Sequence, residues 1–150
     1  MAHTYTNLLT HVIFSRKGRA PHIDAELRGR LLPYLGGIIR ELGGKTRIVN
    51  CEPDHVHMLA TLPPKLAVAD ALRVLKTNSS RWVHEQWPSR RAFAWQTGYS
   101  AFSVSESNAE AVAAYIEGQG EHHRKVTFQQ EYLAFLTRHG IEYDQRHVWD

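Results

Sequence analysis

Two histidines separated by one residue, His55 and His57, are the first side chains whose spacing could support metal chemistry. They lie in the segment HVHMLATL, whose composition predicts a strand over residues 55–62. Side chains two residues apart on a strand point to the same face, about 7 Å apart along it. Both imidazoles can therefore converge on one ion, while Val56 and Met58 face a core on the other side. Taken alone, the pair fits two surface histidines at least as well.

Tyr115 and Gln119 form the second candidate pair. They are four residues apart in a segment whose apolar residues, beginning at Ala109, follow helical spacing, so they lie side by side. On a helical wheel Tyr115 and Gln119 lie about 110° and about 70° from the centre of the apolar stripe, on the same side. That position is also typical of a tyrosine packing at the margin of a core. The other tyrosines fall in strand-like segments, an amphipathic helix, a Pro/Gly cluster or the tail, where packing explains them.

The two pairs make chemical sense together. A metal held by two neutral imidazoles and one neutral amide keeps its full positive charge for a phosphate oxygen. A tyrosine beside the third ligand would be placed to attack that phosphorus, although a phenol with a reference pKa near 10 needs help to lose its proton.

Other kinds of metal site fit the sequence poorly. An H-x-H-x-D hydrolase needs an acid where Leu59 stands, and zinc-finger spacing is impossible with Cys51 as the one cysteine.

The composition is that of an ordinary folded protein. The chain has 150 residues, 43% of them hydrophobic and 22% charged, which favours one compact domain spanning 1–150. We find no apolar run of the ~20 residues that a membrane helix needs and no signal-peptide pattern. A single cysteine makes a reducing cytoplasm the simplest setting. Lys and Arg outnumber Asp and Glu by 18 to 15, and the pI is about 9.2, which permits a polyanionic partner without proving one.

The order of predicted elements indicates the fold class. We expect strands over 4–14, 46–51 and 55–62 and an extended segment over 92–104, interrupted at Thr97 and Gly98. A helix capped by Asp24, kinked at Pro33 and stopped by Gly43 follows the first strand, and a second helix follows Pro63 and Pro64. The resulting β-α-β-β-α-β order is that of an α+β, ferredoxin-like split βαβ fold, an antiparallel sheet with helices packed on one face.

Two further helices complete the chain as a C-terminal helical extension. Ser107 and Glu110 have the spacing of a capping box and predict a helix that runs to about Gln119. Thr127 and Gln130 predict another box, opening a helix that ends near His139. The fold itself hosts RNA binders, metal chaperones and nucleases, so it leaves the function open.

Several segments, taken in order, resemble the single-tyrosine HUH transposases of small insertion sequences. They are CEPDHVHML, WQTGY and YIEGQ, supported by TYTNLLTHVIF at the start and by KTNSSRWV. They also resemble the relatives of these enzymes that are associated with repetitive extragenic palindromes. The likeness covers nearly the whole chain, and the order and spacing of the segments are more specific than any one of them.

The resemblance implies roles for the residues singled out above. His55, His57 and Gln119 would be the metal ligands, Tyr115 the nucleophile, and Mg²⁺ or Mn²⁺ the cofactor. The substrate would be hairpin-bearing single-stranded DNA, cut and rejoined through a 5′-phosphotyrosine without a nucleotide cofactor. A nitrogen-rich ligand set suits manganese or zinc better than magnesium, so the metal stays open. The family also implies a homodimer, in which the tyrosine helix of one subunit serves the site of its partner in at least one state. The short polar connection at residues 105–107 and Gly118 favour such an exchange, so we predict a dimer with composite active sites.

Basic residues in three regions are candidates for holding the DNA backbone: the loop after the first strand, the second helix with its exit, and the stretch after the tyrosine helix. Trp95 or Tyr99 could stack a base beside them. Arg90 and Arg91 at the exit of the second helix, and His122, His123 and Arg124 after the tyrosine helix, are further candidates. For each of these the alternative is a solvated charge or a core aromatic. The predicted DNA contacts are Arg16, Lys17, Arg19, Lys76, Arg81 and Lys125.

Three other functions remain compatible with the sequence. A HUH replication initiator or relaxase would use the same chemistry, although those proteins carry further domains. A non-catalytic ferredoxin-like nucleic-acid-binding module would keep the basic loops but would need neither His57 nor Tyr115. A metal carrier would keep the histidines without cleaving DNA.

Overall fold

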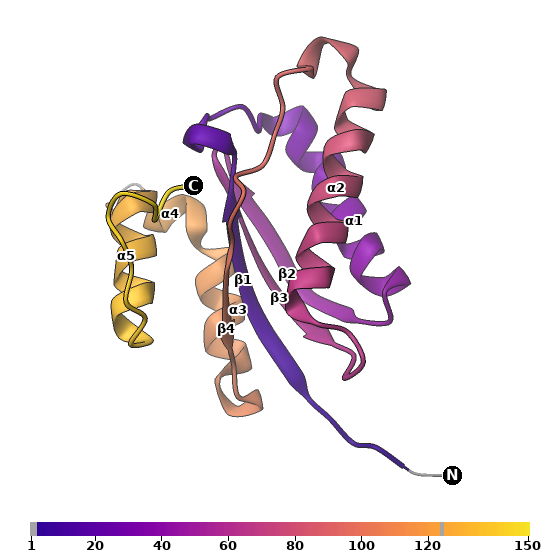
Figure 1. The fold of residues 1–150 in the computed structure, drawn as a ribbon, viewed down its shortest axis with the longest axis vertical. Helices are drawn as coiled ribbons and strands as arrows, with labels where there is room; N and C mark the ends of the chain where they lie inside the picture. The colour runs from indigo at the N-terminus through magenta and orange to yellow at the C-terminus, as the bar shows by residue number, and fades with distance from the viewer. Residues whose placement is uncertain (1–2, 124) are drawn as a thin grey trace.

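A four-stranded antiparallel sheet, in the order β2-β3-β1-β4, divides the molecule into two layers of helices (Figure 1). The computed structural model of the chain describes residues 3–123 and 125–150. The expected α+β, split βαβ fold is confirmed. The strands and the helices around them are β1 (Leu8–Ser15), α1 (Ala25–Glu41), β2 (Lys45–Glu52), β3 (His55–Leu62), α2 (Val68–Gln86) and β4 (Ser100–Ser103). The extension comprises α3 (Ala109–Glu117), α4 (Gln119–His122) and α5 (Phe128–Arg138), and short 3-10 turns lie at Lys17–Arg19, Pro88–Arg90 and Glu106–Asn108.

Strand β3 occupies the interior of the sheet and is covered on both faces. It pairs with β1 along its whole length and with β2 on its other side. Val56 and Met58 enter the larger core, which α1 and α2 complete. Leu59 faces the opposite way, towards α3, in a smaller core with Ile116. Because side chains alternate along a strand, His55 and His57 share the Leu59 face and lie under the helical extension.

The first helix begins and ends where the sequence indicates. Asp24 caps α1, its carboxylate accepting from the Leu27 amide at 2.9 Å. The helix runs without interruption through Pro33. It stops before Gly43, whose φ of +90° favours glycine. At the next residue, a Cβ on Gly44 would lie 2.7 Å from the Thr61 carbonyl oxygen, so only glycine allows the chain to pass so close to β3.

The first strand and the third helix differ from their predicted bounds. Residues 4–7 do not join the sheet, and Tyr5, expected to pack, is 90% exposed because β1 gains a partner only from Leu8 onwards. The expected Ser107 capping box is also wrong. Ser107 bonds the Ser105 hydroxyl at 3.0 Å, in a 3-10 turn, and the helix itself starts at Ala109.

The helical extension covers the face of the sheet that α1 and α2 leave free (Figure 1). Helix α3 lies against β2 and β3. Helix α5 packs through Phe128, Tyr132 and Leu136 against Ile13 of β1 and Phe102 of β4. Its N-terminus carries the expected capping box, in which Thr127 accepts from the Gln130 amide and the Gln130 side chain accepts from the Thr127 amide. Among the described residues, no helix has the length and apolar character that crossing a membrane requires.

The capping box gives a direct test of how firmly α5 is held. Replacing Thr127 with Ala removes the side-chain acceptor for the Gln130 amide, so we expect the free energy of unfolding to fall by about 1 kcal/mol. Urea unfolding followed by circular dichroism measures this loss. Thr137→Ala, an exposed change in the same helix, is the matched control and should stay close to wild type. Equal stability of the two variants would contradict a role for the cap.

Candidate metal centre and nucleophile

Both histidines of the HVHM segment are fully buried on the covered face of the sheet. His57 pairs with Ile13 on β1 and with Asn50 on β2, and His55 pairs with Ser15 and Glu52. The alternation expected from the sequence therefore places both imidazoles under α3 and α5 rather than at the surface. Their ring centroids are 5.2 Å apart.

Gln119 reaches the same place because the helical extension breaks in front of it. Helix α3 ends at Glu117, and Gly118 caps it before the short α4 begins at Gln119. The Gln119 side chain is fully buried, with its Oε1 3.4 Å from His55 Nε2 and 2.8 Å from His123 Nε2. Asn50 holds the end of α3 in register, since its amide donates to the Ile116 carbonyl at 2.8 Å.

Glu131 and His123 join this cluster, and neither was predicted as a metal ligand. Glu131 Oε1 lies 2.9 Å from His57 Nε2 and 3.7 Å from His55 Nε2. His123 Nε2 lies 3.4 Å from the other carboxylate oxygen. One ligand atom from each of His55, His57, His123 and Glu131 falls within 4.8 Å of all the others.

Sequence signals for both residues exist. Glu131 interrupts the apolar stripe of α5 between Phe128 and Tyr132, where a charged residue must be buried with a partner. His123 follows Gln119 by four residues and so shares its helical face.

The donor chemistry of the cluster fits a cation. His55 Nδ1 lies 2.6 Å from the Asp54 carboxylate, which places the imidazole proton on Nδ1 and a lone pair on Nε2. Gln119 Oε1 and Glu131 Oε1 face that Nε2, and both are acceptors. Ligands bound at about 2.1 Å lie about 3.0 to 3.4 Å from one another around an octahedral or tetrahedral ion. The spacing and the converging lone pairs therefore suit a divalent metal.

Each histidine of the pair has a partner that orients its ring. Asp54 binds His55 Nδ1, and His11 Nε2 lies 2.9 Å from His57 Nδ1. Carboxylate and imidazole partners of this kind fix the tautomer and direct the remaining nitrogen towards a metal. Burial lowers the pKa of His57, and it lowers the pKa of His11 to about 3, with the nearby His57 adding to the effect. Both rings are therefore neutral at pH 7, the form that binds metals.

Tyr115 lies at the edge of the cluster, as the helical wheel indicates. Its ring centroid is 6.0 Å from that of His57, and its hydroxyl donates a hydrogen bond to Glu131 Oε2, with His122 Nε2 at 3.4 Å. Burial raises the pKa of the Tyr115 hydroxyl, and the Glu131 carboxylate raises it further. The phenol is therefore protonated at pH 7, and it needs a base in order to act as a nucleophile. The structure thus brings Tyr115, His55, His57 and Gln119 of one chain together.

The predicted DNA contacts do not lie on one surface. Arg16 is 2% exposed, and its guanidinium donates to the Ala94 carbonyl at 2.7 Å and lies over the Phe93 ring, so it is a structural residue and not a DNA contact. Lys17 and Arg19 follow β1 at the end of the sheet that carries His55, and Lys125 follows α4. Arg81 is exposed on α2. Arg124 lies outside the described residues.

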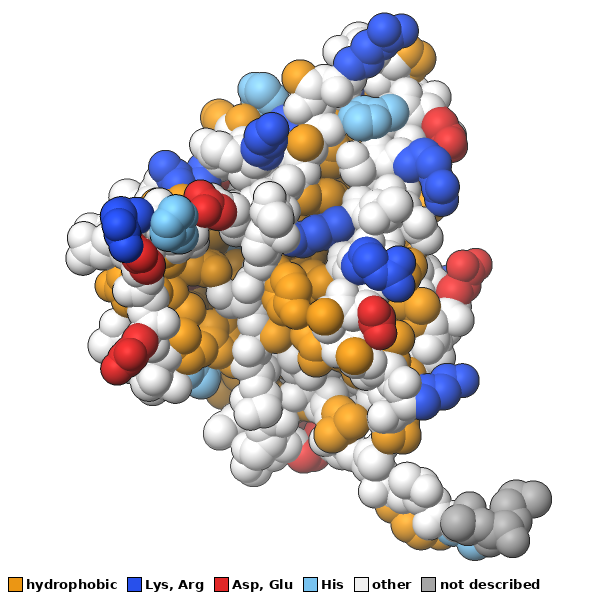
Figure 2. All heavy atoms as spheres, viewed as in Figure 1, with side chains coloured by type: hydrophobic (Ala, Val, Ile, Leu, Met, Phe, Trp, Pro, Cys, Tyr) orange, Lys and Arg blue, Asp and Glu red, His pale blue; other side chains and the backbone are white. Residues whose placement is uncertain are grey.

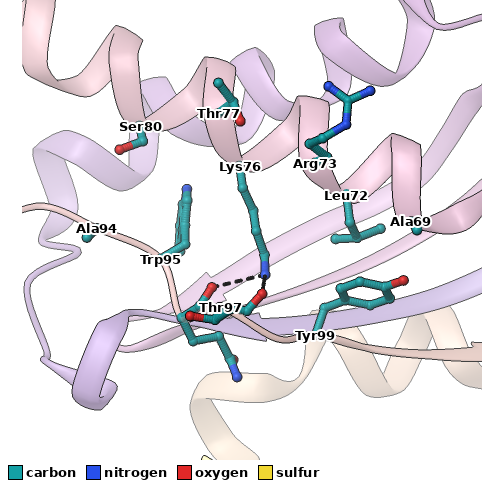
Figure 3. A pocket seen from close by; sticks show the side chains of 11 residues that line it. Ala69, Leu72, Arg73, Lys76, Thr77, Ser80, Ala94, Trp95, Thr97 and Tyr99 are labelled. Carbon is teal, nitrogen blue, oxygen red and sulfur yellow. Dashed lines mark hydrogen bonds between the residues drawn. The ribbon is translucent and has the colours of Figure 1, made fainter. Parts of the chain in front are cut away.

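Lys76 borders a groove of about 480 Å³ between α2 and the chain before β4 (Figure 3). Its ammonium donates to the Gln96 and Thr97 carbonyls at 3.1 and 3.2 Å and also to the Gly98 carbonyl. Trp95, which was a candidate for base stacking, is a core residue whose indole donates to Ser79. In Figure 2 the Lys and Arg side chains are spread over this face and do not form one dense patch.

Comparisons with known proteins agree with this architecture. Residues 4–119 match the family described as "Transposase IS200 like". The transposase for insertion sequence element IS200 of Salmonella typhimurium strain LT2 is 32% identical over 130 residues, covering 81% of this chain and 82% of the relative. A crystal structure of a Deinococcus radiodurans R1 protein assigned as a transposase superimposes with a TM-score of 0.65 at 26% identity, covering 79% of this chain and 96% of the other.

A second solved structure shares the fold. It is that of a REP-associated tyrosine transposase bound to a REP hairpin, with a TM-score of 0.61. It covers 84% of this chain and 74% of the other, at 14% identity.

The Asp54 contact predicts how firmly the cluster can hold a metal. In Asp54→Ala the His55 ring loses the acceptor that fixes its tautomer, so we expect the affinity for Mn²⁺ to fall by about 10- to 100-fold. Isothermal titration with Mn²⁺ measures the change. Asp70→Ala, on the exposed side of α2, is the control and should bind as wild type does. A variant at Asp54 with unchanged affinity would mean that His55 does not ligate the ion.

Proposed function

This chain belongs to the IS200-like transposase family, and from that membership we propose that it binds hairpin-bearing single-stranded DNA and cleaves and rejoins it through Tyr115. The observation that carries the proposal is the position of the Tyr115 hydroxyl beside buried side chains that could ligate a metal. A tyrosine at the margin of an ordinary core needs no such cluster. The neighbour bound to a REP hairpin supports hairpin DNA as the substrate.

The proposed reaction is a reversible transfer of a phosphoryl group. The Tyr115 oxygen attacks the scissile phosphorus, and the new O–P bond forms as the P–O3′ bond breaks. The products are a 5′-phosphotyrosine and a strand with a free 3′-hydroxyl. The phenolic proton leaves towards His122 Nε2, and the departing 3′-oxygen takes up a proton from the protonated imidazole or from water. Attack by a 3′-hydroxyl at a new junction reverses these steps, and the covalent link conserves the energy.

The chain's own residues divide the remaining work. His55, His57 and Gln119 would hold the divalent ion, with Asp54 and His11 orienting the histidines. The bound ion supplies positive charge to a non-bridging phosphate oxygen. The nitrogen-rich cluster favours Mn²⁺ over Mg²⁺. We expect Lys17, Arg19 and Lys125, at the same end of the sheet as His55, to bind phosphates near the cleaved bond, and Arg81 to meet a more distant part of the DNA. Lys76 would have to leave its carbonyl acceptors in order to bind a phosphate.

The nucleophile is the first test of the function. We expect Tyr115→Phe to bind a labelled hairpin strand as wild type does and to form no covalent adduct, because it lacks only the attacking oxygen. Denaturing gels with Mn²⁺ present measure the adduct, and excess chelator should abolish it in the wild type. Tyr143→Phe, an exposed change in the tail, is the control.

Each contrary result points to a different function. An adduct that persists in Tyr115→Phe would identify another tyrosine. Binding without any adduct in the wild type would favour the non-catalytic nucleic-acid-binding module, and Mn²⁺ binding without DNA binding would favour the metal carrier.

The homodimer stays a proposal, and the structure bears on how its sites would be built. One chain supplies a complete set of site residues, with Tyr115 against its own His57. We therefore expect that mixed and re-assorted His57→Ala and Tyr115→Phe proteins remain inactive, because every mixed dimer has one defect in each one-chain site. The adduct assay on the mixture measures this. Recovered cleavage would show that the tyrosine helix is exchanged between subunits.

A further inference from the structure

Helix α5 holds the Glu131 carboxylate firmly against the metal centre. Phe128, one turn earlier, stacks on the His55 ring with centroids 4.0 Å apart. Tyr132, the next residue, is buried and bonds the Ser100 hydroxyl on β4. The capping box at Thr127 fixes the start of the helix. Glu131 therefore reaches the site from a packed element whose position the core determines.

A buried carboxylate needs a positive partner. Glu131 is 3% exposed, and its ion-pair partners among the described residues are all histidines. A buried carboxylate is costly unless it is paired, and a bound cation would offset that cost.

The two oxygens of Glu131 face different groups. Oε1 faces the Nε2 atoms of His57 and His55, at 2.9 and 3.7 Å. Oε2 faces the Tyr115 hydroxyl, with His122 Nε2 at 3.0 Å. The 2.9 Å separation is close to the ligand-to-ligand distance in a coordination sphere, the 3.7 Å separation is slightly longer, and Oε2 accepts a hydrogen bond from Tyr115 on the other side.

We propose that Glu131 is a further ligand of the divalent cation, binding it through Oε1 while Oε2 holds the Tyr115 hydroxyl beside it. The role of the cation in DNA cleavage rests on the proposed function, whereas the binding of the cation by Glu131 does not. The ligand set becomes two imidazoles, an amide and a carboxylate, which lowers the net charge of the site by one and suits Mn²⁺. One side chain then links the position of the cation to that of the nucleophile.

The same contacts allow one rival role for Glu131. Its carboxylate could occupy the place of the scissile phosphate, to be displaced when DNA binds. The direction of Oε1 towards both histidines of the HVHM segment favours the ligand role, because a group standing in for phosphate need not approach either Nε2 atom so closely. The packing of α5 favours it too, since displacing Glu131 would separate Phe128 from His55.

Mn²⁺ binding to the whole protein without DNA tests the proposal. Electron paramagnetic resonance of free Mn²⁺ gives the dissociation constant of each variant. We expect Glu131→Gln, which keeps the shape and removes the charge, to weaken binding by at least about tenfold. Glu131→Asp keeps the charge, so it should bind Mn²⁺ more tightly than Glu131→Gln does. Glu117→Gln, an exposed carboxylate-to-amide change on α3, is the matched control and should bind as wild type does. Circular dichroism melting, with and without Mn²⁺, shows that each variant is folded and whether the ion stabilises it.

The outcomes separate the site from the function. A folded Glu131→Gln protein with wild-type Mn²⁺ affinity overturns the proposal, and an increase in covalent adduct in that variant identifies the phosphate-mimic role instead. Weakened Mn²⁺ binding in Glu131→Gln supports the ligand role even if the wild type forms no adduct, in which case the proposed function fails by itself. A normal adduct in the wild type together with unchanged Mn²⁺ binding in Glu131→Gln means that the proposed function holds and that Glu131 is not a ligand.

Discussion

The burial of β3 on both faces is the constraint on which the rest of the structure depends. A strand in the interior of a sheet must present apolar residues to each layer that covers it, or polar residues that find partners there. Val56 and Met58 meet the first requirement on the α1 and α2 side. His55 and His57 meet the second on the other side, where Asp54, His11 and Glu131 bond their ring nitrogens. The candidate metal centre is thus also the polar part of a core.

The helical extension supplies what the sheet lacks. With α1 and α2 alone, the face that carries His57, Leu59 and Phe102 would be open to water. Helix α3 covers Leu59 through Ile116, and α5 covers Phe102 and Ile13. The same two helices carry Tyr115 and Glu131, so the packing that seals the sheet also places the proposed nucleophile and the carboxylate over the histidines. Stability and the geometry of the site therefore depend on the same contacts.

Much of this arrangement could be predicted from local patterns. The strand over residues 55–62, the Asp24 cap and the Thr127 capping box follow from spacing and turn chemistry, and the structure has each of them where expected. The start of β1 could not be predicted in this way. The segment around Tyr5 has the composition of a strand, but it has no partner strand to pair with. Arg16 looked like a surface charge in a basic loop, and only the tertiary contacts with Ala94 and Phe93 show that it is buried.

Glu131 shows why the site itself was harder to predict than the fold. It lies 74 residues from His57 in the chain, and no motif spacing connects the two. The sequence signal for Glu131 is a charged residue at a position that the helical pattern predicts to be buried. A carboxylate in the middle of an apolar stripe is unfavourable unless another segment provides a partner. Charged residues on buried stripes are therefore worth treating as site candidates even when no motif includes them.

The exposure of the side chains around the cluster indicates the route by which a phosphate would approach. The exposed fraction of the side chain rises from His57, at 0%, through His123, at 13%, to His122, at 30%. Tyr115 lies on that same side, with its hydroxyl close to both Glu131 and His122, so under the proposed function an entering strand would meet Tyr115 before the buried histidines.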